Sequence, residues 1–185
     1  MTPLRFPVAI PALSEESLTL RELREEDIPA WFARASDAEA ADLAGDPVPN
    51  SIDGGVRWLE RQRDLFRMQA GIRWAMVPLG SSVSVGTVGL TLSPNEQNKA
   101  ELGIVLARSF WSKGLGTTAA RMAVRYGLYE IGLSEIRAEV LQRNPASIRL
   151  LEKAGFKMIR VQPPTEAEPE VMIVYALSRP SPSAV

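Results

Sequence analysis

The stretch from Glu101 to Thr118 constrains the fold of this 185-residue chain more strongly than any other part of it. A β-rich run leads through Lys113-Gly114-Leu115-Gly116-Thr117-Thr118 into a segment with helical periodicity. Glycines let backbone N–H groups approach an anion closely, and the amino-terminal end of a helix carries partial positive charge. The arrangement predicts a phosphate-binding loop, in which Lys113 adds a charge and the threonines add hydroxyl donors. A tight turn that binds nothing is the alternative.

Two nucleotide-binding folds use similar loops. A Walker-type site is excluded because no Gly-Lys-Ser/Thr triplet occurs. Gly114 to Ala119 matches the Gly-x-Gly-x-x-Gly/Ala dinucleotide fingerprint, and Glu135 or Glu139 lies near the offset of about 20 residues expected for a ribose-binding acid. However, residues 108–112 separate the strand from the first glycine, and further βαβ units are missing. A dinucleotide-binding enzyme is therefore a weaker alternative.

The composition limits the chemistry that the chain can perform. It contains no cysteine and no histidine, which excludes disulfides, thiolate and imidazole metal ligands, and a cysteine or histidine in catalysis. We therefore expect no metal. The 21 basic and 22 acidic side chains give a net charge of -1, whereas nucleic-acid binders usually carry a basic excess. We expect no nucleic-acid partner.

Signals for secretion or membrane insertion are not found in the sequence. Prolines interrupt residues 1–13, which lack the apolar stretch of a signal peptide. No run of about 18 apolar residues occurs that could cross a bilayer. We expect a cytoplasmic protein with no membrane partner.

Periodicity along the chain predicts an α+β fold, in which a mostly antiparallel sheet of about seven strands is flanked by four helices. The predicted strands cover residues 17–23, 72–77, 83–92, 100–107, 136–140, 156–161 and 171–177, and the predicted helices cover 24–44, 52–69, 115–131 and 145–154. A single domain, residues 17–179, is expected to follow an N-terminal extension, residues 1–16, and to precede a loose tail, residues 180–185.

Two helix boundaries have clear local signals. Asn144-Pro145 is typical of a helix start, because asparagine caps the free N–H groups and proline suits the first helical position. Gly132 and Gly155 are typical of helix ends, where a left-handed residue is needed.

Three segments together resemble the GCN5-related N-acetyltransferases (GNAT), specifically the RimJ/RimL-like group of ribosomal-protein alanine acetyltransferases. Ala100–Leu106 is similar to the family's fourth strand, Trp111–Ala119 to its pyrophosphate loop, and Asn144–Phe156, the most specific match, to its last core helix. The order of elements agrees with the family from Leu18 to Leu177.

The resemblance implies a GNAT-like fold and an N-acetyltransferase that uses acetyl-CoA as co-substrate. In this family an amine attacks the acetyl thioester directly, without a covalent enzyme intermediate. By resemblance, the backbone of Ile104, Val105 and Leu106 holds the pantetheine arm, and the side-chain amide of Asn144 contacts it. By the same resemblance, the pyrophosphate is bound by the loop residues Lys113, Gly114, Leu115, Gly116, Thr117 and Thr118.

The chain departs from the family at two positions. Trp111 stands where the loop often begins with glutamine or arginine, which leaves less side-chain charge near the phosphates. Leu151 stands where many relatives have a tyrosine that acts as general acid, so another group must fill that role.

The reaction requires proton transfer, because a lysine amine has a pKa of roughly 10.4 and an α-amine one of roughly 7.7–8.0. Glu101 is the predicted base, since it enters the strand expected to line the acetyl group and matches a glutamate of the resembling group. Ser147 is the predicted donor to the departing thiolate, because it shares the first helical turn with Asn144. A solvated strand-end charge and a helix-surface serine are the respective alternatives.

The acceptor is predicted only as a primary amine, either a protein N-terminal α-amine or a small molecule. Asp42 and Asp46 lie near the loop between the first helices, where they could receive a cationic substrate, although a surface turn is the favoured interpretation. A non-catalytic acyl-CoA-binding or sensor domain is the alternative from another class. The sequence leaves the oligomeric state open, with a homodimer as one candidate.

Overall fold

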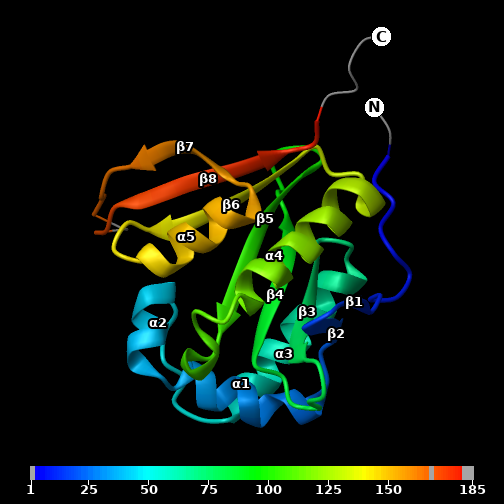
Figure 1. Ribbon diagram of the computed structural model, residues 1–185, viewed down its shortest axis with the longest axis vertical. Helices are drawn as coiled ribbons and strands as arrows, with labels where there is room; N and C mark the ends of the chain where they lie inside the picture. Colours follow the sequence, from blue (N-terminus) through cyan, green and yellow to red (C-terminus); the bar gives the residue numbers. More distant parts are fainter. Residues whose placement is uncertain (1–2, 167–168, 181–185) are drawn as a thin grey trace.

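The chain folds around one eight-stranded sheet, which the computed structural model describes over residues 3–166 and 169–180 (Figure 1). The strand order is β1-β2-β3-β4-β5-β6-β8-β7. The strands are β1 (Leu13–Glu15), β2 (Leu18–Glu22), β3 (Gly71–Pro78), β4 (Gly86–Leu92), β5 (Lys99–Leu106), β6 (Glu135–Leu141), β7 (Lys157–Gln162) and β8 (Met172–Ser178).

The pairing of the strands confirms the predicted α+β class. Every neighbouring pair in the described sheet is antiparallel except β5 and β6, which run parallel with α4 between them in the chain. A doubly wound sheet needs several consecutive parallel pairs. The dinucleotide-binding alternative is therefore wrong.

The described residues contain five α-helices rather than four. They are α1 (Ile28–Ala35), α2 (Ala38–Ala44), α3 (Asp53–Arg67), α4 (Leu115–Arg125) and α5 (Pro145–Ala154). The predicted helix over residues 24–44 is divided because Asp37 begins a new one. Its carboxylate caps α2 by accepting a hydrogen bond from the Ala40 N–H at 3.1 Å.

The segment predicted as an N-terminal extension, residues 1–16, packs against the domain over its described part. β1 pairs with β2 at the edge of the sheet. The Trp74 indole N–H donates to the Pro11 carbonyl at 2.9 Å, and the Arg5 N–H donates to the Ile131 carbonyl at 2.8 Å. Of the predicted loose tail, residues 181–185 lie outside the described residues.

Side chains alternate between the two faces of the sheet, and each face has its own apolar cluster. The larger cluster joins Trp74 and Val88 to Met122 of α4 and Leu151 of α5. On the opposite face, Ala75 and Val77 pack with residues of α1 and α3 in a smaller cluster, whose members are Leu23, Ile28, Trp58, Leu59, Ala75 and Val77. The sheet thus separates an α4–α5 face from an α1–α3 face.

Local signals place the helix ends as predicted. Gly155 ends α5 with φ 99°, and Gly132 ends a six-residue π-helical continuation of α4, Tyr126–Ile131, with φ 93°. Both values lie in the left-handed region that glycine tolerates. Within the described parts of the chain, no helix has the length and apolar character that crossing a bilayer requires.

Candidate active site

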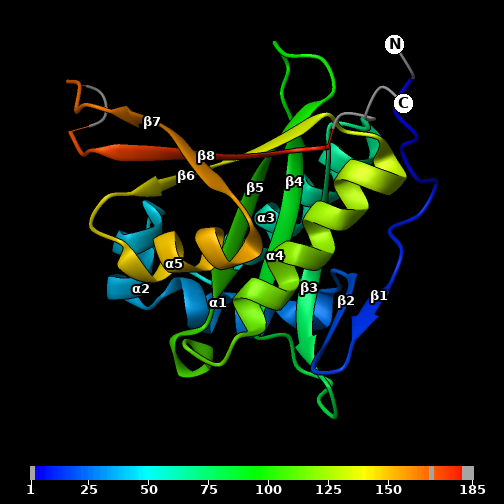
Figure 2. The same cartoon turned by 45° about the horizontal axis from the view of Figure 1, so that its top comes forward.

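The sheet divides at β5. β5 and β6 are paired only from Lys99–Glu135 to Glu101–Arg137, although β5 continues to Leu106. Beyond this point β6, β8 and β7 run away from β3, β4 and β5, as Figure 2 shows. On the side of β5 that faces away from β4, the described chain places no strand beside residues 102–106, and we call this side the unpaired β5 edge. Missing strand pairing leaves backbone donors and acceptors available to a ligand.

Backbone groups alternate between the two sides of a strand, and two hydrogen bonds set the register in β5. The Lys99 carbonyl accepts from the Ser93 N–H, on the β4 side, at 2.9 Å. The Asn98 carbonyl accepts from the Ser134 N–H, on the β6 side, at 2.8 Å. Odd-numbered residues of β5 therefore turn their N–H and C=O groups toward β4, and even-numbered residues turn theirs toward the unpaired β5 edge.

This register narrows the set of predicted pantetheine contacts. Ile104 and Leu106 present their backbone groups at the unpaired β5 edge, whereas Val105 pairs with Thr87 of β4 and turns its backbone groups away from this edge. The Trp111 indole N–H donates to the Leu106 carbonyl at 2.8 Å, which ties the loop to the end of β5. One lone pair of that carbonyl is used, so Ile104 offers the freer donor and acceptor.

The predicted phosphate-binding loop leads directly into α4. Ser112 and Gly114 adopt left-handed φ angles of 60° and 81°. Gly114 is the N-cap residue, and no side chain caps the helix. The N–H groups of the first turn are therefore open to an anionic ligand. Lys113 is exposed, with its Nζ 5.0 Å from the centre of the Phe110 ring.

Side chains in the first turn of α4 divide between the core and the loop. Leu115 is buried in the larger apolar cluster, so it can offer a ligand only its backbone. Thr117 and Thr118 are half-buried, and the Thr118 N–H donates to the Gly114 carbonyl at 3.0 Å. The two threonine hydroxyls remain the predicted side-chain donors of the loop.

Gly116 serves helix packing as well as the loop. A Cβ added to it would lie 2.6 Å from Cδ1 of Leu150 in α5 and 3.9 Å from Cδ1 of Ile104 in β5. The sequence pattern predicts this glycine as part of a phosphate-binding loop, with a tight turn as the alternative. The structure shows that it also lets the start of α4 approach α5, so that β5, α4 and α5 meet here.

Asn144 is 9% exposed and uses both ends of its side-chain amide. Oδ1 accepts from the Ser147 N–H at 3.1 Å, which confirms the predicted cap of α5. Nδ2 donates to the Leu43 carbonyl of α2 at 2.9 Å. One amide N–H therefore remains for a ligand.

Ser147 is half-buried, and its hydroxyl makes no hydrogen bond within the described residues. Leu151, at the position where relatives often have tyrosine, is 3% exposed and belongs to the core. The α5 position at which those relatives have a tyrosine acting as general acid is thus apolar and buried here. Ser147 stays the proton donor that is predicted on this helix.

Glu101 lies where β5 and β6 part, on the α1–α3 face of the sheet, opposite Arg137 in the strand register. Partial burial raises the pKa of the Glu101 carboxyl, nearby Glu139 raises it further, and the charge of Arg73 opposes the shift. A raised pKa brings a carboxylate closer to the range in which it works as a base near neutrality. Ser147 belongs to α5 on the opposite face, so the two predicted catalytic residues lie on different sides of the sheet.

Two arginines hold α2 against both halves of the sheet. Arg108, just after β5, pairs with Asp37 at 2.5 Å and with Glu39. Arg143, just after β6, pairs with Asp42 at 2.6 Å. Asp42 is therefore already paired, which agrees with the favoured interpretation of a surface turn and disfavours a role in receiving a cationic substrate.

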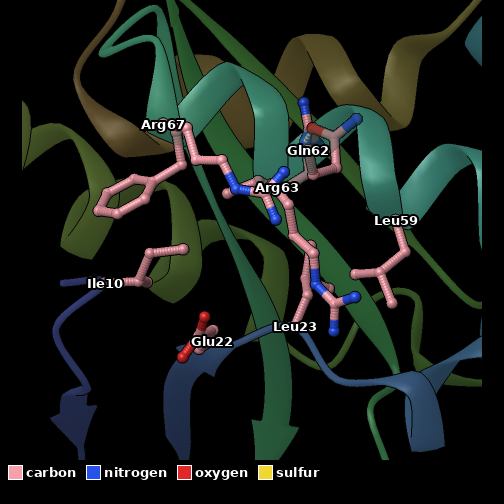
Figure 3. Close-up of a pocket in the computed structure, with 9 residues that line it drawn as sticks. Ile10, Glu22, Leu23, Leu59, Gln62, Arg63 and Arg67 are labelled. Atoms are coloured by element: carbon pink, nitrogen blue, oxygen red, sulfur yellow. Dashed lines mark hydrogen bonds between the residues drawn. The ribbon is translucent and has the colours of Figure 1, made fainter.

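A cavity of about 190 Å³ opens between the N-terminal segment, the end of β2 and α3 (Figure 3). Its lining mixes apolar side chains with arginines of α3 and consists of Ile10, Glu22, Leu23, Leu59, Gln62, Arg63, Phe66, Arg67 and Arg73. No site residue predicted from the sequence lines it. Arg73 lines this cavity, and its charge also acts on the Glu101 carboxyl.

Sequence reasoning missed two arginines, Arg34 of α1 and Arg73 of β3. The available signal was Arg73 itself, a charge within the otherwise apolar run from Ile72 to Val77, whose other members are buried. Asp46 lies within the electrostatic reach of both arginines. Burial raises the pKa of its carboxyl, while Arg73 and Arg34 oppose the shift.

Comparison with known proteins identifies the family. Residues 17–157 match the family model for the acetyltransferase (GNAT) domain. The chain belongs to the GNAT acetyltransferase family. It is therefore an acyltransferase enzyme, an N-acetyltransferase, and the non-catalytic alternative is not supported.

Relatives and solved structures agree with this assignment. The chain is 31% identical over 147 residues to YoaA, an uncharacterised N-acetyltransferase of Bacillus subtilis, covering 80% of this chain and 83% of that protein. A GNAT acetyltransferase from Bacillus anthracis has a TM-score of 0.79 at 20% identity, covering 90% of this chain and 98% of that one.

A spermidine N-acetyltransferase from Vibrio cholerae, solved with CoA and spermine, has a TM-score of 0.74 at 19% identity. The match covers 89% of this chain and 96% of that one. At this identity the likeness shows that the two proteins share a fold.

Proposed function

We propose that this GNAT enzyme transfers an acetyl group from acetyl-CoA directly to a primary amine, without a covalent enzyme intermediate. The observation that carries the proposal is the unpaired β5 edge next to the uncapped start of α4. An extended arm with amide groups can pair with Ile104 and Leu106 as an added strand would. The N–H groups of the first α4 turn can meet the pyrophosphate at the same time. The spermidine acetyltransferase with this fold was solved with CoA.

Phosphate binding in this proposal depends mainly on the backbone. The left-handed Gly114 turns the chain into α4, so that the N–H groups of Leu115 to Thr117 point out of the helix end. Lys113 adds a surface charge, and Thr117 and Thr118 add hydroxyl donors. Trp111 contributes no charge, and instead its indole holds the Leu106 carbonyl. Asn144 offers its one remaining amide N–H to the coenzyme arm.

Glu101 takes the proton of the attacking amine, directly or through a water molecule. The carboxylate is suited to this role because partial burial and Glu139 raise its pKa. Ser147 donates to the departing thiolate from the first turn of α5. When bound, acetyl-CoA supplies the activated acetyl group, and the residues of this chain position it and move protons.

The acceptor belongs to the broad class of primary amines. A protein N-terminal α-amine would fit the RimJ/RimL-like group, and a small-molecule amine would fit neighbours such as the spermidine acetyltransferase. The ion pair between Asp42 and Arg143 weighs against a polycationic acceptor at that position.

Ligand-dependent melting tests the proposal. A ligand that binds only the native state raises its melting temperature by mass action, so acetyl-CoA should raise it and NADH should not. Release of free thiol from acetyl-CoA in the presence of an amine panel then reports turnover. A protein that is stabilised by NADH but not by acetyl-CoA would overturn the proposal.

The unpaired β5 edge allows a sharper test with proline. Ile104→Pro removes a backbone N–H that faces the edge, so it costs no hydrogen bond to β4 and should weaken acetyl-CoA binding while the fold persists. Ile104→Ala is the matched control, because it also loses the side chain but keeps the N–H. Equal acetyl-CoA affinity in both variants would remove this backbone contact from the proposal.

A further inference from the structure

The Arg73 side chain reaches from β3 across β4 to β5. The register places Arg73 beside Gly89 and Gly89 beside Gly103, all on the α1–α3 face. A Cβ on Gly89 would lie 3.0 Å from the Cβ of Arg73, and a Cβ on Gly103 would lie 2.9 Å from Nη2 of Arg73. The two glycines therefore leave the room through which the guanidinium extends. The guanidinium of Arg73 ends beside Gly103, which lies two positions after Glu101 in β5.

The hydrogen-bond partners of this guanidinium are all neutral. Nε donates to Oε1 of Gln62 at 3.1 Å, and Nη1 donates to Oγ1 of Thr87 at 3.4 Å and to the Gly103 carbonyl at 3.5 Å. The last two distances are long for hydrogen bonds. In the described structure no carboxylate forms an ion pair with Arg73, and its burial lowers the pKa of the guanidinium.

Arg34 adds a second incompletely paired guanidinium. Its Nε is buried and has no hydrogen-bond partner among the described residues. Burial lowers the pKa of Arg34 to about 10, and the neighbouring charge of Arg73 lowers it in the same direction. Asp46 opposes the shift, but it forms no ion pair with either arginine in the described chain. A buried cation that lacks a paired counter-ion is costly to maintain.

Opposite charges lie next to each other on this face of the sheet. Glu101 and Glu139 form an acidic pair where β5 and β6 part, and Glu101 also feels the charge of Arg73. Arg34 and Arg73 form the positive side. A molecule with an ammonium group and an anionic group would match the acidic pair with the first and the two arginines with the second. A polyamine would instead be repelled by the two guanidinium groups.

We propose that Arg34 and Arg73 bind an anionic group of the acceptor, a carboxylate or a phosphate, so that the enzyme acetylates amines that carry such a group. The inference rests on the proposed N-acetyltransferase function and names its substrate class. Guanidinium groups bind both anions through paired N–H donors. In this arrangement the amine lies toward Glu101 and the anionic group toward the glycines of β4 and β5.

Matched amine pairs test the substrate class with the wild-type enzyme. The pairs are alanine with alaninamide and O-phosphoethanolamine with ethanolamine, and spermidine and an N-terminal alanine peptide amide complete the panel. We expect kcat/KM to be about 10- to 100-fold higher for the anionic member of at least one pair, the range that follows from charged hydrogen bonds. The pair that shows the difference distinguishes a carboxylate from a phosphate. Equal or lower values for both anionic members would overturn the inference.

Variants at the two arginines test whether these residues cause the preference for anionic acceptors. Arg73→Met and Arg34→Met should reduce the ratio of kcat/KM between the anionic and the uncharged amine at least 10-fold, mainly through KM. The rise in melting temperature caused by acetyl-CoA should stay unchanged. Arg61→Met, at an exposed position of α3, is the matched control and should keep the preference. An unchanged preference in both folded variants would overturn the assignment, and if the variants do not fold, the wild-type pairs decide alone.

Product binding gives a readout that does not need turnover. In the presence of CoA, N-acetylalanine or N-acetyl-O-phosphoethanolamine should raise the melting temperature more than its uncharged partner, N-acetylalaninamide or N-acetylethanolamine. Equal shifts would overturn the inference. Failure of acetyl-CoA itself to bind would instead contradict the proposed function, so the two failures are distinguishable.

Discussion

Leu150 of α5 occupies the space that a side chain on Gly116 of α4 would need, with its Cδ1 2.6 Å from the position of the absent Cβ. The start of the helix that bears the proposed phosphate loop is therefore fixed against the helix that bears Asn144 and Ser147. A substitution at Gly116 acts on this helix contact before it acts on any ligand.

Gly116→Val should lower the free energy of unfolding by about 1–3 kcal/mol, because extra methyl groups in a packed contact force its neighbours to move. Leu150→Ala in the same background should recover part of that loss by making room. Urea denaturation of both single variants and the double variant measures the coupling between the two sites. Strictly additive effects would contradict the contact.

Asn144→Ala should lower the free energy of unfolding by about 1–3 kcal/mol, because it removes both the cap of α5 and the bond to the Leu43 carbonyl. Ser147→Ala is the control on the same turn and should leave stability nearly unchanged, since alanine is a good helix former. Thermal or urea unfolding measures both. Equal losses in the two variants would show that the cap is not the cause.

If Ser147 protonates the thiolate, Ser147→Ala should also lower turnover by tens-fold, at the weak end of general-acid effects. Its acetyl-CoA affinity should stay nearly constant, as expected for an interaction made mainly in the transition state. Wild-type turnover in this variant would leave Ser147 as a helix-surface residue.

Glu101→Gln should lower kcat by roughly 10²–10⁴-fold, with the loss easing as pH rises and more of the amine is already neutral.

Glu139→Gln should have a different effect. Removing that like charge lowers the pKa of Glu101, so the acidic limb of the kcat/KM profile should move to lower pH. An acidic limb at the same pH in Glu139→Gln and wild type would show that Glu139 does not influence the pKa of the base.

The same raised pKa has a consequence for stability. Glu101 binds its proton more tightly in the folded state than in the unfolded state, so its contribution to stability is greatest at low pH and is lost as pH rises through its folded pKa. Glu101→Gln should therefore unfold at a slightly higher urea concentration than wild type at pH 7. It should show no such advantage at pH 4. A difference of the opposite sign would contradict the raised pKa.

Arg108→Gln and Arg143→Gln should loosen α2 without unfolding the protein. The ion pairs of the two arginines are at the surface and contribute little to global stability, but they link α2 to the two halves of the sheet. Hydrogen exchange should show faster exchange of the α2 amides in each variant and unchanged exchange in β3 and β4. Arg61→Gln, which is exposed on α3, is the control.

Features that depend on local chemistry could be predicted from the sequence. Asn144 and Gly155 bound α5 as expected, because a cap and a left-handed residue act within one turn. The division between α1 and α2 was missed, although Asp37 is a good N-cap residue, because no glycine or proline interrupts the sequence between Pro29 and Gly45. The alternation of strands and loops was sufficient for the fold class.

Features that depend on register could not be predicted in the same way. A family motif groups Ile104, Val105 and Leu106 together, yet only the pairing with β4 shows that Val105 turns its backbone away from the unpaired edge. The path of Arg73 over Gly89 and Gly103 requires three strands that are up to 30 residues apart in sequence. No local pattern carries that information.

The unpaired β5 edge also bears on how the protein avoids self-association. An exposed strand edge is usually a template on which other chains aggregate, and proteins protect it with charges, bulges or covering elements. This edge lies in the interior of the sheet, with β4 on one side, β6 diverging on the other, and α2 linked by arginines to both halves. A slender arm can be accommodated there, whereas a strand from another molecule would also have to bring its side chains and flanking structure. The enzyme can thus keep open hydrogen-bonding groups for a ligand without offering them to its own copies.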